Sequence, residues 1–324
     1  MKAFYEKYFM KQKMMRTVLL PLSIISLFAI YNFGLRALLL LVFNIVVACI
    51  VEYLCETKIY KKKKISEAVI VTAILYTMTL PVSLPLWISA IGIAFGVFFG
   101  KMVFGGFGKN IFNPALVGRV FIYINFPNPL TIAWNEAASG LPGGFTSMIM
   151  PHIDQVSTAT PMLLFRNDGG TLDALKLFLG NVPGVIGETS KLLIILAAIY
   201  LIYKKVASWE IMAGSIIGFS GLSLIFNLMG VESVPNPIYG MLLGGFLFGV
   251  VFMATDPVSA AKTVPGKWIY GLIIGVVTVI IRGFALFSGG MMFAILIGNL
   301  FAPIIDYTVR GMQAKKKAKK EATA

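Results

Sequence analysis

The chain has 324 residues, of which 58% are hydrophobic and only 13% are charged, whereas a soluble domain carries about 25% charged residues. This composition excludes an ordinary soluble enzyme and indicates an integral membrane protein. The formal net charge of +14 would suggest a nucleic-acid partner for a soluble protein. Here the basic residues lie beside apolar runs, as cytoplasmic anchors of membrane helices do, so we expect no nucleic acid.

Apolar stretches recur from Val18 to Ile305 and predict about ten transmembrane helices in one polytopic domain, residues 1–324. The basic stretch Met1 to Arg16 followed by an apolar run resembles a signal peptide, but no small-residue cleavage site follows. We therefore keep that run as the first span. The expected spans are residues 17–33, 35–55, 66–80, 85–104, 111–126, 188–203, 208–229, 238–255, 267–287 and 290–307.

Lysines gather in alternate connections of this pattern. With the N-terminus inside, the cytoplasmic segments carry Lys58 with Lys61 to Lys64, Lys101 with Lys109, Lys204 with Lys205, and Lys262 with Lys267. Residues 127–187 then form a long external loop, and residues 308–324 form a basic cytoplasmic tail. Connections of this length are commonly functional or disordered, and its apolar patches favour an ordered cap.

Two apolar sequences are weakly alike, AFGVFFGKM (Ala94 to Met102) and LFGVVFMAT (Leu247 to Thr255), and each precedes a polar segment that contains proline. They indicate an all-α fold of two related five-helix halves, in which Gly- and Pro-interrupted segments can mark a binding site. Chance similarity between apolar sequences is the alternative.

Motifs of conventional catalysis are missing from the sequence. There is no HExxH, P-loop, GxSxG or dinucleotide fingerprint, so we expect no catalytic residue in this chain. Cys49 and Cys55 match no zinc or iron–sulfur spacing, and no metal site is expected. The only histidine, His152, lies in the external loop, where it is either a plain surface residue or a neighbour of a bound cofactor.

The external loop contains DQVSTATP, residues 154–161. Asp154, Ser157, Thr158 and Thr160 match the pattern D-x-x-S/T-G/S/T-A-T, at which a flavin transferase esterifies the phosphate of FMN to the final threonine. The spacing alone also fits a turn in which hydroxyl groups bond to nearby backbone. Both interpretations remain open on the spacing.

Four segments occur together in order: GKNIFNPALVGRVF (Gly108 to Phe121), DQVSTATP, FMATDPVSA (Phe252 to Ala260) and GGMMFAILIGN (Gly289 to Asn299). With them the chain, from about residue 17 to 307, resembles the D subunit of the Rnf complex and is similar to the B subunit of the sodium-pumping NADH:quinone oxidoreductase. The latter usually has a longer N-terminal extension than the one seen before Thr17, which favours the Rnf type.

The resemblance implies an electron-carrying subunit in a bacterial or archaeal cell membrane. In Rnf, electrons pass between ferredoxin and NAD while sodium ions or protons cross the membrane. Other membrane and peripheral subunits would supply the iron–sulfur and NAD sites, and a flavin transferase would mature the chain. The subunit is then not catalytic alone.

Residue by residue, the resemblance makes Thr160 the site of covalent FMN, through a phosphoester to its hydroxyl. Asp154, Ser157 and Thr158 then belong to the sequence that the transferase reads. Thr158 departs from the glycine that is commoner at its position.

The resemblance also implies a second flavin, riboflavin, in the membrane part near the cytoplasmic side. Asn110, Asn113 and Asp256 stand in the matching motifs, and their amide and carboxylate groups suit a flavin's ring edge and ribityl hydroxyls. Because Asn113 and Asp256 each precede a proline, they equally suit the end of a helix.

Ionisable residues inside spans commonly face a pathway or a partner. We consider Arg119, Arg282, Asp256 and Asp306, of which Asp256 is the candidate for a cation route. Two other classes of protein fit the same composition: a solute channel or permease, and a membrane scaffold without cofactor. Both would be colourless.

Overall fold

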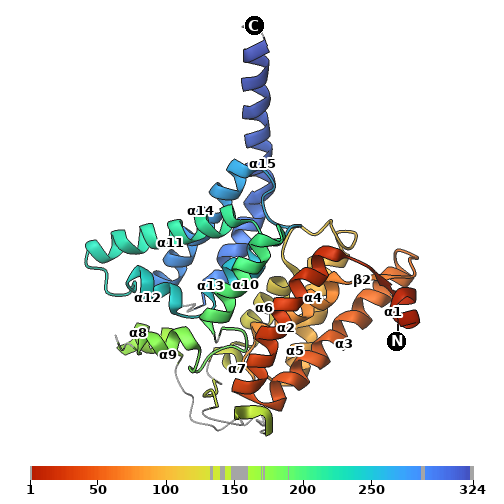
Figure 1. The fold of residues 1–324 in the computed structure, drawn as a ribbon, viewed down its shortest axis with the longest axis horizontal. Helices are drawn as coiled ribbons and strands as arrows, with labels where there is room; N and C mark the ends of the chain where they lie inside the picture. The colour runs from red at the N-terminus through yellow and green to blue at the C-terminus, as the bar shows by residue number, and fades with distance from the viewer. Residues whose placement is uncertain are drawn as a thin grey trace.

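The computed structural model describes residues 2–131, 134–138, 143–146, 160–168, 170, 172–188, 190–285 and 289–321. Most of these residues are helical (Figure 1). The strands among them are β1 (Phe9–Met10) and β2 (Ile65–Ser66), two residues each, which pair in parallel. The prediction of an all-α membrane protein is confirmed.

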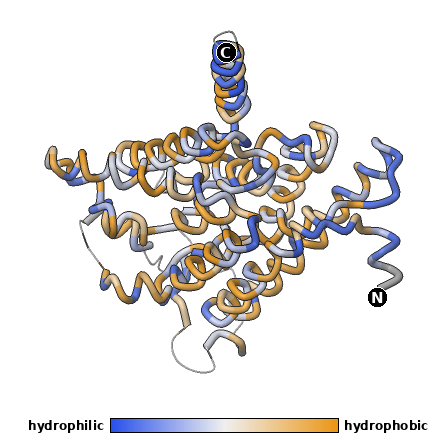
Figure 2. The backbone as a smooth tube through the Cα atoms, turned by 45° about the horizontal axis from the view of Figure 1, so that its top comes forward, coloured by the Kyte–Doolittle hydropathy of each residue, from blue (hydrophilic) through white to orange (hydrophobic). Residues whose placement is uncertain are grey.

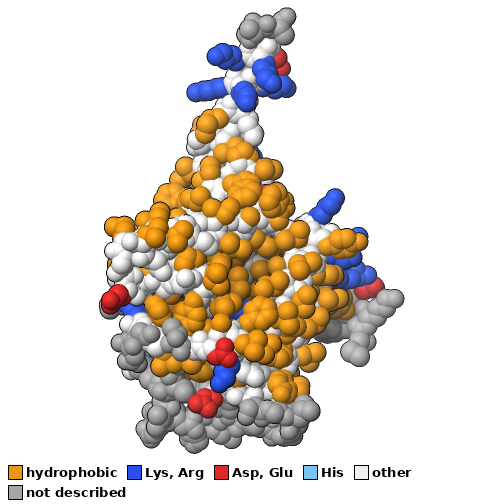
Figure 3. Space-filling model, turned by 60° about the vertical axis from the view of Figure 1, so that its left-hand side comes forward, with side chains coloured by type: hydrophobic (Ala, Val, Ile, Leu, Met, Phe, Trp, Pro, Cys, Tyr) orange, Lys and Arg blue, Asp and Glu red, His pale blue; other side chains and the backbone are white. Residues whose placement is uncertain are grey.

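Five helices are long and apolar enough to cross a membrane: α2 (Lys13–Phe33), α3 (Leu35–Lys58), α11 (Trp209–Leu228), α14 (Val264–Phe284) and α15 (Met291–Glu321). Leucine and isoleucine side chains such as Leu27, Ile50 and Ile217 lie exposed on them. Figure 3 shows hydrophobic side chains spread over the visible face of the bundle. Lipid tails can cover such a face because the helices satisfy their own backbone hydrogen bonds.

Four shorter apolar segments complete most of the bundle: α4 (Ala68–Met78), α5 (Leu86–Val97) with the π-helix η1 (Phe98–Met102), α6 (Pro114–Asn125) and α10 (Lys191–Tyr203). The segment predicted at 238–255 is not one continuous helix. It divides into α12 (Pro237–Leu242), α13 (Phe246–Phe248) and the π-helix η3 (Gly249–Met253). Each of the ten predicted segments therefore contains helix, but one of them is broken.

The break between α12 and α13 follows from its backbone. Leu243 is extended, with φ −75° and ψ 134°, and Gly244 has φ +58°, a left-handed conformation that glycine adopts at little cost. Glycine is needed here for space as well, because a Cβ on Gly245 would lie 2.7 Å from Glu188 Oε1.

The two sequences that resemble each other share a local form. AFGVFFGKM contains η1 and LFGVVFMAT contains η3, and π-helices are rare and frequently lie at functional sites. The likeness between these two segments is therefore visible in backbone conformation as well as in sequence.

Small residues allow neighbouring helices to approach closely, as is common in membrane bundles. A Cβ on Gly275 of α14 would lie 2.2 Å from the Ser215 carbonyl oxygen of α11, and a Cβ on Gly118 of α6 would lie 2.4 Å from the Gly92 carbonyl oxygen of α5. The second contact fixes α6 against α5, and with it the neighbouring Arg119.

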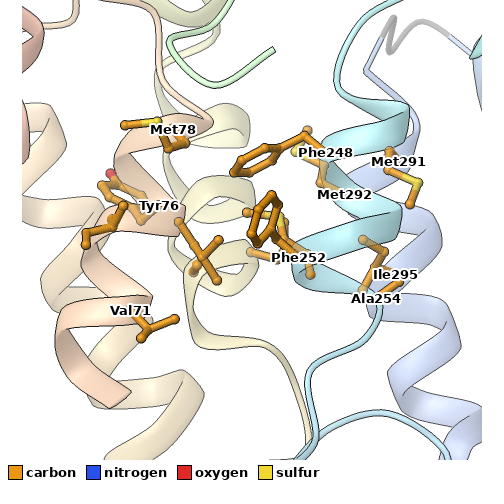
Figure 4. Close-up of a cluster of buried hydrophobic side chains, with 14 of the residues drawn as sticks. Val71, Tyr76, Met78, Phe248, Phe252, Ala254, Met291, Met292 and Ile295 are labelled. Carbon is orange, nitrogen blue, oxygen red and sulfur yellow. The ribbon is translucent and has the colours of Figure 1, made fainter. Parts of the chain in front are cut away.

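The two halves meet at a layer of buried apolar side chains (Figure 4). Val71, Tyr76 and Met78 belong to α4 on one side, Phe248 and Phe252 belong to α13 and η3 on the other, and Met291, Met292 and Ile295 belong to α15 beyond them. The Tyr76 side chain points away from the phenylalanines, and its hydroxyl donates to the Ser89 carbonyl oxygen of α5. The contact between halves is also polar, because the Asn113 backbone N–H donates to Asn299 Oδ1 at 3.1 Å.

The stretch predicted as an external loop contains α7 (Pro127–Thr131), the 3₁₀ helix η2 (Gly143–Thr146), α8 (Pro161–Asp168) and α9 (Ala174–Leu179). The N-terminal helix α1 (Lys2–Tyr8) precedes β1. The basic tail predicted from residue 308 continues α15 as helix to Glu321. Figure 1 shows it projecting from the bundle, opposite α8 and α9, and Figure 2 shows its hydrophilic end.

Candidate functional site

A cavity of about 110 Å³ lies beside Thr160, between the two halves. One water molecule requires about 10–15 Å³, so the cavity admits a larger group. Residues of α4, α6, α8, α10, α15 and the α12–α13 break line it. Its polar and aromatic lining includes Arg119, Trp134, Thr160, Glu188, Lys191 and Phe248.

Thr160 is buried and directly precedes helix α8. Its Oγ1 accepts a hydrogen bond from the Leu163 backbone N–H at 3.3 Å, and its carbonyl oxygen accepts from the Leu164 backbone N–H at 2.9 Å. Thr160 is thus the N-cap, with Pro161 at the first helical position. A group bonded to this oxygen lies at a helix N-terminus, where backbone N–H groups and the helix dipole favour an anion.

The other residues of the motif, Asp154, Ser157 and Thr158, lie outside the described residues, as does His152. Among the four motif residues, Thr160 is the one that the structure describes, and it lines the first cavity. The spacing of the motif suggested either a turn stabilised by hydroxyl groups or a flavin attachment site. Thr160 has a feature of each, since its hydroxyl caps a helix and the residue lines a cavity.

Charged side chains line the first cavity despite their burial. Lys191, 2% exposed, is the first residue of α10, and its Nζ donates to the Glu188 carbonyl oxygen. The Glu188 carboxylate accepts a hydrogen bond from the Gly245 backbone N–H at the break in the helix.

Arg119 is 6% exposed, and its guanidinium lies 5.4 Å from the centre of the Tyr123 ring. Within the described part of the chain, its Nη1 has no hydrogen-bond partner. Buried polar groups are usually paired, so this unpaired N–H group, in the wall of a cavity, indicates a site for an acceptor.

A second cavity, of about 70 Å³, is lined by all three residues that the sequence suggested for riboflavin: Asn110, Asn113 and Asp256. They come from two distant stretches, the segment before α6 and the segment after η3. Phe107 and Phe252 contribute aromatic rings to the same wall. The structure therefore brings these three residues together.

Their side chains also make local hydrogen bonds. Asn113 Oδ1 accepts from the Ala115 backbone N–H at 3.0 Å and caps α6. Asp256 accepts from the Val258 backbone N–H at 3.2 Å and from the Ser259 hydroxyl at 2.7 Å. Burial raises the pKa of the Asp256 carboxyl, against the effect of these bonds. Asn113 therefore combines a helix cap with a cavity-lining position, and Asp256 combines a turn with one.

The two remaining ionisable candidates have structural partners. Asp306 accepts hydrogen bonds from the Lys262 and Thr263 backbone N–H groups, at 2.8 and 2.9 Å, at the start of α14. Arg282 Nη1 donates to the Gly240 carbonyl oxygen at 2.9 Å. Asp306 is therefore part of a helix cap.

One sequence expectation is wrong. We expected Lys101 beside Lys109 at the cytoplasmic surface, but Lys101 is 2% exposed, and its Nζ lies 2.6 Å from Glu52 Oε2 and 2.6 Å from Ser66 Oγ. Lys101 also lines the second cavity. The signal in the sequence was Glu52, a carboxylate inside an apolar span.

The cavities are stacked along the same helices. Along α4, the second cavity contacts Ala68 to Leu75 and the first contacts Met78. The partition between them includes two aromatic rings: Phe248 lines the first cavity, Phe252 lines the second, and their ring centroids are 5.1 Å apart.

The two cavities differ in the chemistry that they suit. The first combines a hydroxyl at a helix N-terminus with two cations, a donor set that fits a cofactor carrying phosphate. The second combines amide and carboxylate groups with aromatic rings, which fits an uncharged aromatic ring system bearing hydroxyl groups.

Comparison with known proteins extends over nearly the whole chain. The family model described as "NQR2, RnfD, RnfE family" matches residues 2–315. The chain is 41% identical over 281 residues to the B subunit of the Na(+)-translocating NADH-quinone reductase of Klebsiella pneumoniae, with 81% of this chain and 63% of the relative covered.

Two further relatives, which are B subunits of the same kind of reductase, give similar values. The chain is 43% identical over 270 residues to the subunit of Chromohalobacter salexigens, with 80% of this chain and 62% of the relative covered. It is 44% identical over 270 residues to the subunit of Azotobacter vinelandii, with 79% of this chain and 63% of the relative covered. The chain thus spans less than two thirds of the length of these curated relatives.

Proposed function

Because the chain belongs to the NQR2, RnfD, RnfE family, we propose that it is a flavin-carrying electron-transfer subunit of an ion-translocating membrane oxidoreductase, with FMN bonded through phosphate to Thr160. The observation that carries the proposal is the position of Thr160. The final threonine of a flavinylation motif lies at a helix N-terminus and in the wall of a cavity that also contains Arg119 and Lys191.

A covalent link gives this site a physical advantage. It replaces the bulk concentration of FMN by an effective concentration of about millimolar, so the cofactor stays bound while its charge changes. When bound, FMN supplies one- and two-electron redox chemistry, while the protein sets its position and solvent access. Thr160 holds the link, and Trp134, Leu116 and Phe248 exclude water around it.

The second cavity is proposed as the site of a noncovalent riboflavin. Asn110, Asn113 and Asp256 line it and offer amide and carboxylate groups. The Phe248–Phe252 partition then lies between the two cofactors. Asp256 is also retained as a candidate for a cation route.

The lysine pattern supports an orientation. Lys61 to Lys64, Lys204 with Lys205, and the basic end of α15 would lie in the cytoplasm with both termini, and the loop with Thr160 would lie outside a bacterial or archaeal cell membrane. Na⁺ or H⁺ transport, and the sites for the electron donor and acceptor, would then belong to the assembly with its partner subunits.

Two complexes are candidates for that assembly. The motifs fit both, and one candidate is an Rnf-type complex between ferredoxin and NAD. The names of the relatives favour a Na⁺-translocating NADH:quinone reductase. Activity measurements on membranes from cells with and without the gene distinguish the two complexes. Deletion should abolish ferredoxin-dependent NAD reduction if the complex is of the Rnf type, and NADH-dependent quinone reduction if it is the NADH:quinone reductase.

The cofactor proposal is tested by coexpressing the chain with the flavin transferase and observing the denaturing gel under ultraviolet light. The wild-type band should fluoresce, and Thr160→Ala should abolish the signal. Thr131→Ala is the control, because Thr131 lines the same cavity outside the motif and its loss should leave the fluorescence unchanged. A dark wild-type band beside an active transferase would contradict the proposal and favour a channel, permease or scaffold.

A further inference from the structure

The first cavity contains an unbalanced positive charge. Arg119 and Lys191 line it with one carboxylate, Glu188. Arg282 adds a further cation within electrostatic range of that carboxylate. Charges out of contact with water are strongly unfavourable unless they are paired, so the charges of this cavity predict an anionic ligand.

The cations differ in their free donors and in their position. Lys191 donates to the Glu188 carbonyl oxygen, and Arg282 Nη1 donates to the Gly240 carbonyl oxygen. Within the described part of the chain, Arg119 Nη1 and the Nε and Nη2 of Arg282 have no hydrogen-bond partner. Of these two arginines, Arg119 is the one that lines the cavity, so it is the cation placed to bind an incoming group there.

The backbone adds to the positive electrostatic potential in the first cavity. Helix α8 begins at Pro161 after its cap Thr160, and helix α10 begins at Lys191 after its cap Ser190. The first residues of both helices, Pro161 and Lys191, line the cavity. Helix N-termini carry a partial positive charge, so two helix ends and two side-chain cations face one volume.

We propose that Arg119, supported by Lys191, binds the phosphate anion of the cofactor attached to Thr160. This rests on the proposed function. A phosphate esterified on both sides carries one negative charge, which offsets part of the excess positive charge that Arg119, Lys191 and Arg282 leave against Glu188. Guanidinium groups suit phosphate oxygens through paired N–H donors. The tether and the anion site then act on the same phosphate.

The proposal predicts opposite effects of one substitution in two states of the protein. With FMN attached, Arg119→Met removes the partner of a buried anion and destabilises the chain. Without FMN, the same change removes an unpaired buried cation and leaves stability unchanged or raises it. A purely structural arginine would give the same shift in both states.

The experiment measures thermal unfolding midpoints in detergent for chains made with and without the flavin transferase, with in-gel fluorescence reporting attachment. We expect Arg119→Met to lower the midpoint of the flavin-loaded protein by at least about 5 °C and not to lower that of the unloaded protein. Arg119→Lys should retain most of the loaded stability.

Arg36→Met is the matched control. Arg36 is also buried, but it donates to the Leu84 carbonyl oxygen and does not line the cavity. Its midpoint shift should be equal in the two states.

Equal shifts for Arg119→Met in both states would overturn the proposal. Loss of fluorescence in Arg119→Met, with fluorescence kept in Arg119→Lys and Arg36→Met, would support it, because the loaded state then requires the cation. If Arg119→Met does not accumulate in either state, Arg119→Gln replaces it, because it also removes the charge: the loaded protein should be destabilised and the unloaded protein should not. A wild-type band without fluorescence would contradict FMN attachment to Thr160. Fluorescence with equal midpoint shifts would contradict only the role of Arg119 in binding the phosphate.

Discussion

Lys101 and Glu52 form an ion pair in the interior of the first half, with Nζ 2.6 Å from Oε2 and at most 2% of either side chain exposed. Ser66 completes the arrangement, since its hydroxyl donates to Glu52 Oε1 at 2.6 Å. Lys101 belongs to η1, Glu52 to α3 and Ser66 to β2. The pair therefore connects three elements beside the second cavity.

Removal of one member should leave a buried unpaired charge. We expect Lys101→Met to lower the free energy of unfolding by about 3–5 kcal/mol, and the double change Lys101→Met with Glu52→Leu to restore much of it, because a buried pair is often replaceable by apolar residues. Chemical unfolding in detergent measures both. Lys109→Met, at an exposed lysine, is the control, and equal stability of the single and double variants would contradict the prediction.

The close approach of α11 and α14 should depend on Gly275. Gly275→Ala places a Cβ 2.2 Å from the Ser215 carbonyl oxygen, so the helices must separate, at a cost of about 1–3 kcal/mol. The matched control is Gly221→Ala on α11, where a Cβ would meet nothing within 4 Å and the change should stabilise by up to about 1 kcal/mol. Thermal midpoints that fall equally for both would contradict this account.

Asn299 should be required for the polar contact between the halves. Its Oδ1 accepts from the Asn113 backbone N–H, and its Nδ2 donates to the Tyr270 hydroxyl at 2.8 Å. Asn299→Leu leaves these buried groups unpaired and should cost about 1–3 kcal/mol, measured by thermal unfolding. Asn125→Leu, which removes an exposed bond within α6, should change stability by less than about 0.5 kcal/mol.

The second cavity makes a prediction about cofactor content. Acid precipitation releases noncovalent flavin into solution and leaves esterified flavin on the protein. Asn110→Leu should lower the released riboflavin severalfold without changing in-gel fluorescence, because Asn110 lines the second cavity and Thr160 lines the first. Thr131→Ala should leave the released flavin unchanged. Undiminished release from Asn110→Leu would remove Asn110 from the proposed site.

Local patterns were enough to predict the helical segments and some of their ends. Apolar runs located all ten segments, and the Asn113–Pro114 step correctly suggested a helix boundary, since proline fits the first turn of a helix and disfavours helical backbone before it. These features depend on residues that are adjacent in the chain. The break at Gly244 was missed, because the surrounding sequence is apolar on both sides and two glycines are its main local signal.

The composition of the sites could not be predicted in full, because they depend on contacts between distant segments. Glu52 and Lys101 are 49 positions apart, and a lysine near a predicted membrane boundary gives no indication of a buried partner. Arg119 and Thr160 belong to different predicted segments, and only the folded bundle places both on one cavity. The motif suggested Thr160, and Arg119 was named separately as an ionisable residue inside a span, but nothing in the sequence connected the two.

The Phe248–Phe252 partition has a consequence for which particles can pass between the cavities. A sodium ion needs oxygen ligands, and a proton needs water or titratable groups, at every point of its route. The side chains of Phe248, Val251, Phe252 and Met253 provide none of these. An electron needs no ligand and crosses packed apolar matter by tunnelling. On the proposed function, the Phe248–Phe252 partition would therefore let electrons pass between the two cavities while offering an ion no side-chain ligand, so an ion route through this chain would have to avoid these two rings.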